Sequence, residues 1–262
     1  SLYRSNILLW EDTLKKAPGK LRALHNLSHF YLVEKNYAQA FAALHSLAKS
    51  KASPYYVSYA HSNLGTLYLQ LEEYSKAEAE FKKGIEVQPS RPSNYLNLGT
   101  VYASQERYQK AIDAYEKAET LYRDFTWGDQ AKASPEIHLN KAHLFFRLGL
   151  HKEAEKSAAH YLKLIPGPGR GHYFLGQLYG ALGKNKAALR EYSQSGNDPK
   201  LKAQAHNHRA MIFVQQNHFN AAIKELEQAI AIDPNMLDAH YNLGNVLIQS
   251  NGDPIMARKH LE

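Results

Sequence analysis

Histidine is the residue type in this chain that could most readily do chemistry, because 14 of its 262 residues are His. His25 and His29 lie four residues apart, so both imidazoles would share one face of a helix, as in many zinc sites. The sequence identifies no third and fourth ligand, and we predict no metal. It contains no cysteine and no nucleophile-elbow, phosphate-loop or metalloprotease motif. We therefore expect this chain to be no enzyme and to hold no cofactor.

Asparagines form the better candidate for a binding site. One Asn lies two residues before each of several small residues that recur along the chain, at Asn26, Asn63, Asn97, Asn140 and Asn242. An amide offers one acceptor and two donors, which suits the backbone of an extended peptide. The alternative is that these amides bond within or between neighbouring repeats. Phe174 and His208 interrupt the row, and four neighbouring side chains are predicted to share its surface: Tyr173, Gln177, Tyr241 and Asn245.

Five further histidines occupy a single slot, four residues before the same small residue. They are His61, His138, His172, His206 and His240. In a repeat of this kind, the position four residues before the small residue normally holds a large, partly buried side chain. We interpret it as structural rather than as a set of metal ligands.

A repeat of 34 residues explains this regularity. The stretch NLGTLYLQLEEYSKA, which begins at Asn63, returns as NLGTVYASQERYQKA, which begins at Asn97. The small residues of the series are Ser28, Gly65, Gly99, Ala142, Gly176, Ala210 and Gly244. An alanine follows twelve residues after each of the first six. The spacing predicts two antiparallel helices in each repeat. Because one pair cannot bury its apolar face alone, neighbouring pairs must stack.

The order small–x2–aromatic, then Ala–x3–aromatic, then Pro resembles the tetratricopeptide repeat (TPR). The resemblance implies an all-α fold, a right-handed superhelical solenoid of about seven helix pairs. It also implies that the first helix of each pair lines a concave, non-catalytic surface that binds proteins or peptides. The Asn row then resembles the asparagine ladder of the O-linked N-acetylglucosamine transferase superhelix. The Lys and Asn pattern of the TPR carboxylate clamp is absent, so we do not expect binding of acidic chaperone C-termini.

We assign the chain to one solenoid over residues 1–262. Residues 1–20 form a helix of a preceding unit, and residues 237–262 a partial repeat. Residues 55–57 and 126–134 are insertions, and Trp127 in the second is either packed in the loop or exposed as a partner contact. The six full repeats are 21–54, 58–91, 92–125, 135–168, 169–202 and 203–236.

The positive charge is concentrated near the N-terminus. Residues 1–51 contain eight Lys or Arg and three acidic residues, and so hold +5 of the net charge of +7. This end is either simply solvated or faces an anionic surface such as lipid headgroups. Basic and aromatic residues do not interleave on one face, so we expect no nucleic-acid partner.

The stretch YRSNILLWEDTLKKAPGKLRALHNL resembles the junction after the last membrane helix of bacterial multi-pass membrane proteins with TPR tails, which are relatives of transmembrane-and-TPR O-mannosyltransferases. That resemblance implies a periplasmic tail beneath a glycosyltransferase-like domain whose active site lies outside this chain. The chain begins without Met and ends in what reads as mid-helix, so we expect it to be a piece of a longer protein. A free-standing soluble scaffold, cytoplasmic or periplasmic, is the alternative, and self-association through the ends is a further expectation.

Overall fold

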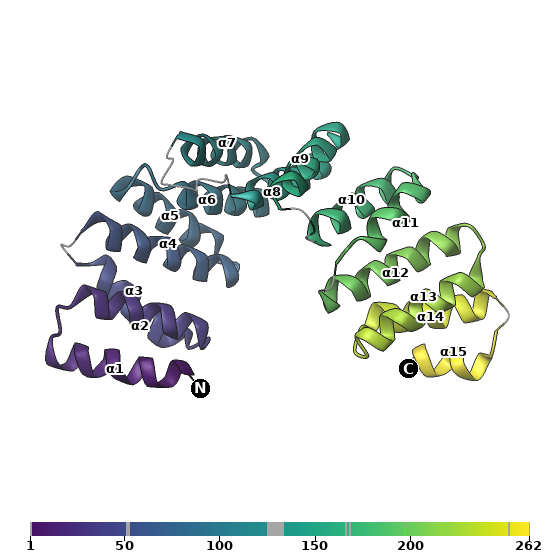
Figure 1. Ribbon diagram of the computed structural model, residues 1–262, viewed down its shortest axis with the longest axis horizontal. Coiled ribbons are helices and arrows are strands. Elements are labelled where there is room, and N and C mark those ends of the chain that lie inside the picture. The colour runs from purple at the N-terminus through teal and green to yellow at the C-terminus, as the bar shows by residue number, and fades with distance from the viewer. Residues whose placement is uncertain are drawn as a thin grey trace. The chain divides into compact units, whose positions relative to one another are not determined.

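The computed structural model describes residues 2–50, 53–124, 134–165, 167, 169–196, 198–250 and 252–261, without the side chains of residues 2 and 3. The described residues form α-helices and no strand, which confirms the all-α prediction (Figure 1). The helices are α1 (Leu2–Lys16), α2 (Leu21–Val33), α3 (Tyr37–Ala48), α4 (Pro54–Gln70), α5 (Tyr74–Val87), α6 (Pro92–Ser104), α7 (Tyr108–Asp124), α8 (Pro135–Arg147), α9 (His151–Leu164), α10 (Gly169–Ala181), α11 (Asn185–Ser193), α12 (Pro199–Gln215), α13 (Phe219–Ile232), α14 (Leu237–Gln249) and α15 (Pro254–Leu261).

The chain divides into two compact units, Ser1–Ile137 and His138–Glu262. In the first unit α1 packs on α2, and the pairs α2–α3, α4–α5 and α6–α7 follow in order. In the second unit α10–α11, α12–α13 and α14–α15 pair in the same way. The first helices of neighbouring pairs also touch, as α2 with α4, α4 with α6, α10 with α12 and α12 with α14.

Close packing within a pair depends on the recurring small residue. A methyl group at Gly99 would lie 2.6 Å from the ring of Tyr115, and one at Gly176 would lie 2.6 Å from the ring of Tyr192. Glycine is therefore found where the second helix presents an aromatic ring. In the sixth repeat Ala210 takes the glycine position, and the residue sixteen positions later is Leu226. The alanine of the second helix is fully buried in all six full repeats, at Ala40, Ala77, Ala111, Ala154, Ala188 and Ala222.

The turn between the two helices of a pair has one backbone geometry. The residue seven positions after the small residue has a positive φ in six repeats, at Lys35, Glu72, Glu106, Gly149, Gly183 and Asn217. The left-handed region is unfavourable for residues that have a Cβ atom. The four non-glycine residues are therefore held there by the packing of the helices on either side.

Helix starts differ from the repeat bounds drawn from the sequence in two places. Helix α4 begins at Pro54, so residues 55–57, which we expected to be an insertion, form its first turn. Helix α12 begins at Pro199, where the side chain of Asp198 accepts hydrogen bonds from the backbone N–H of Lys200 and Leu201. A proline at the first helical position suits both starts, because it has the helical φ and needs no N–H partner.

Within the described residues the C-terminal segment forms a helix pair, α14 with the eight-residue α15. Ala257 is buried on α15, and Leu261 occupies the space beside Gly244 that an aromatic ring fills elsewhere. Both lie one residue later than the register predicts, because the loop before α15 is one residue longer. Trp127 lies outside the described residues. None of the helices in the described ranges combines the length and apolar character needed to cross a bilayer.

Candidate protein-binding face

The first unit presents three of the predicted asparagines from neighbouring first helices. Asn26 on α2, Asn63 on α4 and Asn97 on α6 are all partly buried. The Nδ2 of Asn63 donates to the carbonyl of Tyr59 over 2.9 Å, and the Oδ1 of Asn26 lies 3.2 Å from Nδ1 of His25. Within the described residues, the Asn97 side chain forms no hydrogen bond. Each amide therefore keeps hydrogen-bonding capacity that its own helix does not use.

A cavity of about 310 Å³ lies beside Asn63, between α2 and α4. Asn63, Thr66 and Gln70 supply polar groups from successive turns of α4. The opposite wall is formed by Leu32, Val33 and Tyr37, with the charged Lys35 in the turn between α2 and α3. Amides beside apolar side chains can bond a peptide backbone and bury one of its side chains at the same time.

In the second unit the predicted site residues Tyr173 and Gln177 form a cluster with His208. The hydroxyl of Tyr173 lies 3.0 Å from Nε2 of His208 and 3.4 Å from Nε2 of Gln177. The His208 ring also stacks on Tyr192, with ring centres 5.4 Å apart. Burial raises the pKa of Tyr173 and, against a weaker opposite effect of Asp238, lowers the pKa of His208. Both side chains are therefore neutral at pH 7.

The remaining residues of the predicted row differ in their hydrogen-bond partners and in their exposure to solvent. The Nδ2 of Asn242 donates to Oδ1 of the buried Asn207 over 2.9 Å, which joins α14 to α12. This bond spans 35 residues, as does that between His208 and Tyr173. The alternative use of the Asn slot, bonding between repeats, therefore applies at Asn242. Asn140 is partly buried and interacts with neighbouring groups, Asn245 is partly buried, and Tyr241 is 62% exposed.

The histidine slot joins the two helices of a repeat, a partnership that the sequence analysis missed. Nδ1 of the histidine lies 2.7 to 2.8 Å from a glutamate 19 residues later in three repeats, in the pairs His61–Glu80, His172–Glu191 and His206–Glu225. The recurring spacing was a signal that could have revealed the pairs. Where the histidine position holds Leu24 or Tyr95, the glutamate position holds Ala43 or Ala114. The structural role predicted for this slot is confirmed in these three repeats.

Two other members of the slot have different partners. The ring of His138 stacks on that of His160, with centres 4.8 Å apart, and Nδ1 of His240 lies 2.8 Å from Nδ1 of His260. His25 packs against the ring of Tyr59. In the part of the chain that the structure describes, no three His, Asp or Glu side chains gather as metal ligands would.

Sequence comparison identifies tetratricopeptide repeats in two segments. Residues 62–124 match a family model described as tetratricopeptide repeat, and residues 210–251 match one described as TPR repeat. These segments cover most of the second, third and sixth repeats and part of the partial repeat 237–262. Among proteins of curated function, none matches the chain.

Solved structures show the same fold. A tetratricopeptide repeat protein from Parabacteroides merdae ATCC 43184 aligns with a TM-score of 0.68 and 18% identity, over 94% of this chain and 92% of that one. A chain of the APC/C hetero-tetramer Cut9-Hcn1 aligns with a TM-score of 0.62 and 17% identity, over 97% of this chain and 51% of that one, so this chain spans about half its length. YrrB, a TPR protein with an unusual peptide-binding site, aligns with a TM-score of 0.50 and 21% identity, over 69% of this chain and 88% of that one. The predicted TPR fold is therefore confirmed.

Proposed function

We propose that this tetratricopeptide-repeat protein is a non-catalytic scaffold that binds an extended segment of a partner protein along its first helices. The observation that carries the proposal is the cavity beside Asn63, where three polar side chains of α4 face Leu32, Val33 and Tyr37, with Lys35 beside them. Tetratricopeptide repeats are protein-interaction modules, and the coarse function follows from that fold. YrrB, a protein of this fold, has an unusual peptide-binding site, and this supports peptide binding as the use of the fold here.

The cavity fits an extended peptide better than a folded surface. Its volume of about 310 Å³ accommodates one side chain of a peptide rather than a whole helix. Asn63 and Gln70 lie seven residues apart on α4, about 10 Å along the helix axis. That distance matches about three residues of an extended chain, so both amides could bond one peptide backbone. Asn97, on the next first helix, would continue the same row.

The test is a selection of random peptides of about 12 residues on the immobilised protein, followed by titration of the best peptide. Asn63→Ala and Asn97→Ala should each weaken binding about tenfold, which corresponds to the loss of one or two hydrogen bonds. Asn220→Ala is the matched control, because Asn220 is exposed on the second helix α13 and should leave binding unchanged. Equal affinities in all three variants, with unchanged helicity, would refute the site.

We further propose that the scaffold is the extracytoplasmic tail of a membrane protein, with its N-terminal end near anionic lipid. Lys16, Lys20 and Arg22 are exposed around the α1–α2 turn, which supports this orientation. Co-sedimentation with vesicles that contain phosphatidylglycerol should occur at low salt, fall at high salt and weaken in the Lys20→Glu variant. Absence of binding at low salt would favour the free-standing scaffold instead. Sequencing of the reading frame upstream of Ser1 tests the membrane domain itself.

A further inference from the structure

A small cavity lies in the second unit, between the end of α11 and the helix α12 that follows it (Figure 1). Its volume is about 160 Å³, well below the roughly 300 Å³ at which pockets for drug-sized ligands begin. A ligand group of a few heavy atoms therefore fits it best. We call this cavity the α11–α12 pocket. Its polar lining comes from the end of α11, the following turn and α12, as Ser193, Ser195, Gly196, Lys202, His206 and Arg209.

Two polar residues of the α11–α12 pocket occupy positions that belong to the core in other repeats. Arg209 directly precedes the small residue Ala210, a position that is a buried leucine in five units, at Leu27, Leu64, Leu98, Leu175 and Leu243. Ser195 lies 19 residues after Gly176, where the other full repeats have the buried residues Leu47, Gly84, Ala118, Tyr161 and Ala229. Packing of the repeat requires neither polar group, so their meeting in one pocket favours a ligand.

Several hydrogen-bond donors of the pocket have no acceptor. Ser195 is 2% exposed, yet its hydroxyl forms no hydrogen bond with any described residue. The backbone N–H of Gly196 also lacks an acceptor in the described part of the chain. In the Arg209 guanidinium, Nη2 lies 2.9 Å from Oε1 of Glu225, whereas the buried Nε is unpaired within the described ranges. Because an unpaired buried donor costs free energy, these groups favour an acceptor in the pocket.

The charge of the lining is positive. Lys202 is exposed and forms no ion pair with a described residue, and Arg209 adds a second cation. No carboxylate of the described residues lines the pocket. The acids on adjoining segments are bonded to other groups: Glu225 to Arg209 and His206, Glu191 to His172 and Arg190, and Asp198 to the first N–H groups of α12. Glu225 offsets the charge of Arg209, and the charge of Lys202 is left for a ligand.

A small anion with several acceptor oxygens satisfies these groups together. A phosphate group carries a charge of about −1.5 to −2 at pH 7, and its oxygens accept strong hydrogen bonds in several directions. The donors of the pocket likewise converge from two directions, the turn after α11 and the side of α12. We propose that the α11–α12 pocket binds a phosphate group, with oxygens that accept from Ser195 and Gly196 and that face Lys202 and Arg209. The proposal is independent of the peptide row on the first helices.

Inorganic phosphate is the first probe. In NMR spectra that record backbone N–H groups, phosphate should shift the signals of Ser195 and Gly196 along one saturable curve, and chloride at equal ionic strength should not. Arg209→Leu and Ser195→Ala should each weaken phosphate binding at least about tenfold. Both variants introduce a residue that other repeats hold at the same position, so the fold should persist, which circular dichroism checks.

The matched pair of lysine variants separates the pocket from general charge. Lys202→Gln should weaken phosphate binding severalfold. Lys200→Gln should leave it unchanged, because Lys200 is exposed on the first turn of the same helix but does not line the pocket. Equal weakening in the two variants would overturn the proposal, since the anion would then respond to net charge alone. Absence of saturable shifts at Ser195 and Gly196 would overturn it as well.

The source of the phosphate group is decided by a second ligand pair, a peptide with one phosphoserine and the same peptide without the phosphate. If the phosphopeptide binds more tightly than inorganic phosphate, and Arg209→Leu removes this gain, the pocket recognises a phosphorylated segment of a partner. If inorganic phosphate binds as tightly as the phosphopeptide, the ligand is a soluble phosphate. Either result supports the pocket. Equal binding of both ligands to wild type and to Arg209→Leu would contradict it.

Discussion

Glu80 accepts two short hydrogen bonds, from Nδ1 of His61 and from Nζ of Lys83, each over 2.7 Å. The first bond joins α5 to α4 and the second lies within α5. Burial alone would raise the pKa of Glu80, but the two bonds outweigh burial and lower it to about 2. Glu80 is therefore ionised in the folded protein well below the pH at which an ordinary glutamate takes up a proton.

The Glu80 pair predicts a loss of stability in acid. Because the folded pKa is below the ordinary value of 4.5, the stabilisation is present above pH 4.5 and is lost as the pH falls towards 2. Glu80→Gln should cost about 1–3 kcal/mol at pH 7 and should flatten the stability profile between these values. Urea titrations at pH 7, 4.5 and 3 measure this. Glu116→Gln, at an exposed position of α7, is the control, and an unchanged profile in Glu80→Gln would contradict the assignment.

A second pH effect should come from His208 at higher pH. Burial lowers its pKa below the ordinary value of 6.5, so the folded state favours the neutral ring. The associated stability is present above pH 6.5 and is lost as the pH falls through the lowered value. His208→Gln should reduce the change in unfolding free energy between pH 7.5 and pH 5.5, as measured by urea titration. His218→Gln, at an exposed histidine of the same unit, should retain the wild-type change.

The contact between Gly99 and Tyr115 predicts a strong coupling between the two positions. Gly99→Ala adds a methyl group 2.6 Å from the ring and should destabilise the protein by about 1–3 kcal/mol, despite the better helix propensity of alanine. The double variant Gly99→Ala, Tyr115→Leu reproduces the Ala210 and Leu226 combination of the sixth repeat. It should therefore be more stable than the sum of the two single changes predicts, and additive effects in thermal melts would disprove the coupling.

The helix-pair turns predict stabilising glycine substitutions. Glu72 and Glu106 have φ values of 58° and 60°, a region that costs a non-glycine residue about 1 kcal/mol. Glu72→Gly and Glu106→Gly should each raise the melting temperature. Lys117→Gly, on the exposed face of α7, should lower it, because glycine costs about 1 kcal/mol inside a helix. A decrease in all three variants would show that the turn geometry carries no strain.

Most of the helix arrangement could be predicted from the sequence, because it depends on a pattern that repeats. The recurring small residue and the alanine twelve positions later set which helix faces meet, and Ala77 and Ala111 are buried as expected. The sequence could not show that residues 55–57 extend α4, since the signal there is the single Ser53-Pro54 start. It also missed the extra loop residue before α15, because the repeat pattern continues on both sides of it.

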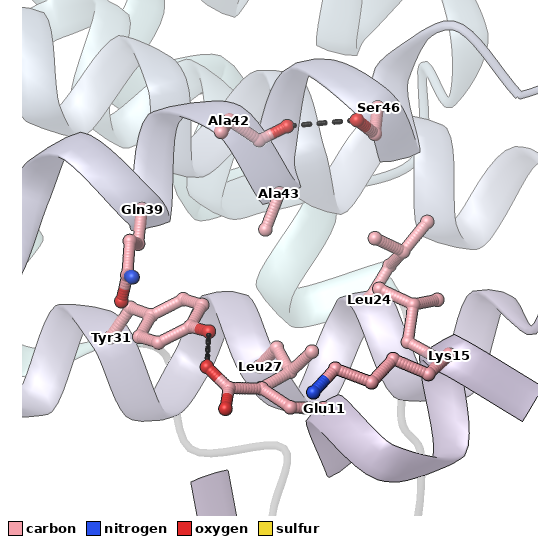
Figure 2. Close-up of a pocket in the computed structure, with 10 residues that line it drawn as sticks. Glu11, Lys15, Leu24, Leu27, Tyr31, Gln39, Ala42, Ala43 and Ser46 are labelled. Atoms are coloured by element: carbon pink, nitrogen blue, oxygen red, sulfur yellow. Dashed lines mark hydrogen bonds between the residues drawn. The ribbon is translucent and has the colours of Figure 1, made fainter. Parts of the chain in front are cut away.

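The candidate site was less predictable than the fold. The Asn row marks one face of the first helices, but hydrogen bonding at each position depends on the neighbour that the stacking supplies. Asn242 meets the amide of Asn207, whereas Asn63 turns back to its own helix and leaves a cavity beside it. The cavity of about 620 Å³ between α1 and α3 (Figure 2) depends on the small volumes of Ala42 and Ala43, and such a gap has no sequence motif.

The most direct test of the protein-binding account uses the absence of cysteine from the chain. A single cysteine introduced by Thr66→Cys lies in the cavity beside Asn63 and can be labelled with an environment-sensitive dye. The account predicts that a selected extended peptide shifts the emission of this dye, with a midpoint equal to the Kd measured independently. A dye attached through Ala79→Cys on α5 should not respond. Saturable peptide binding that leaves the dye at position 66 silent would contradict the account.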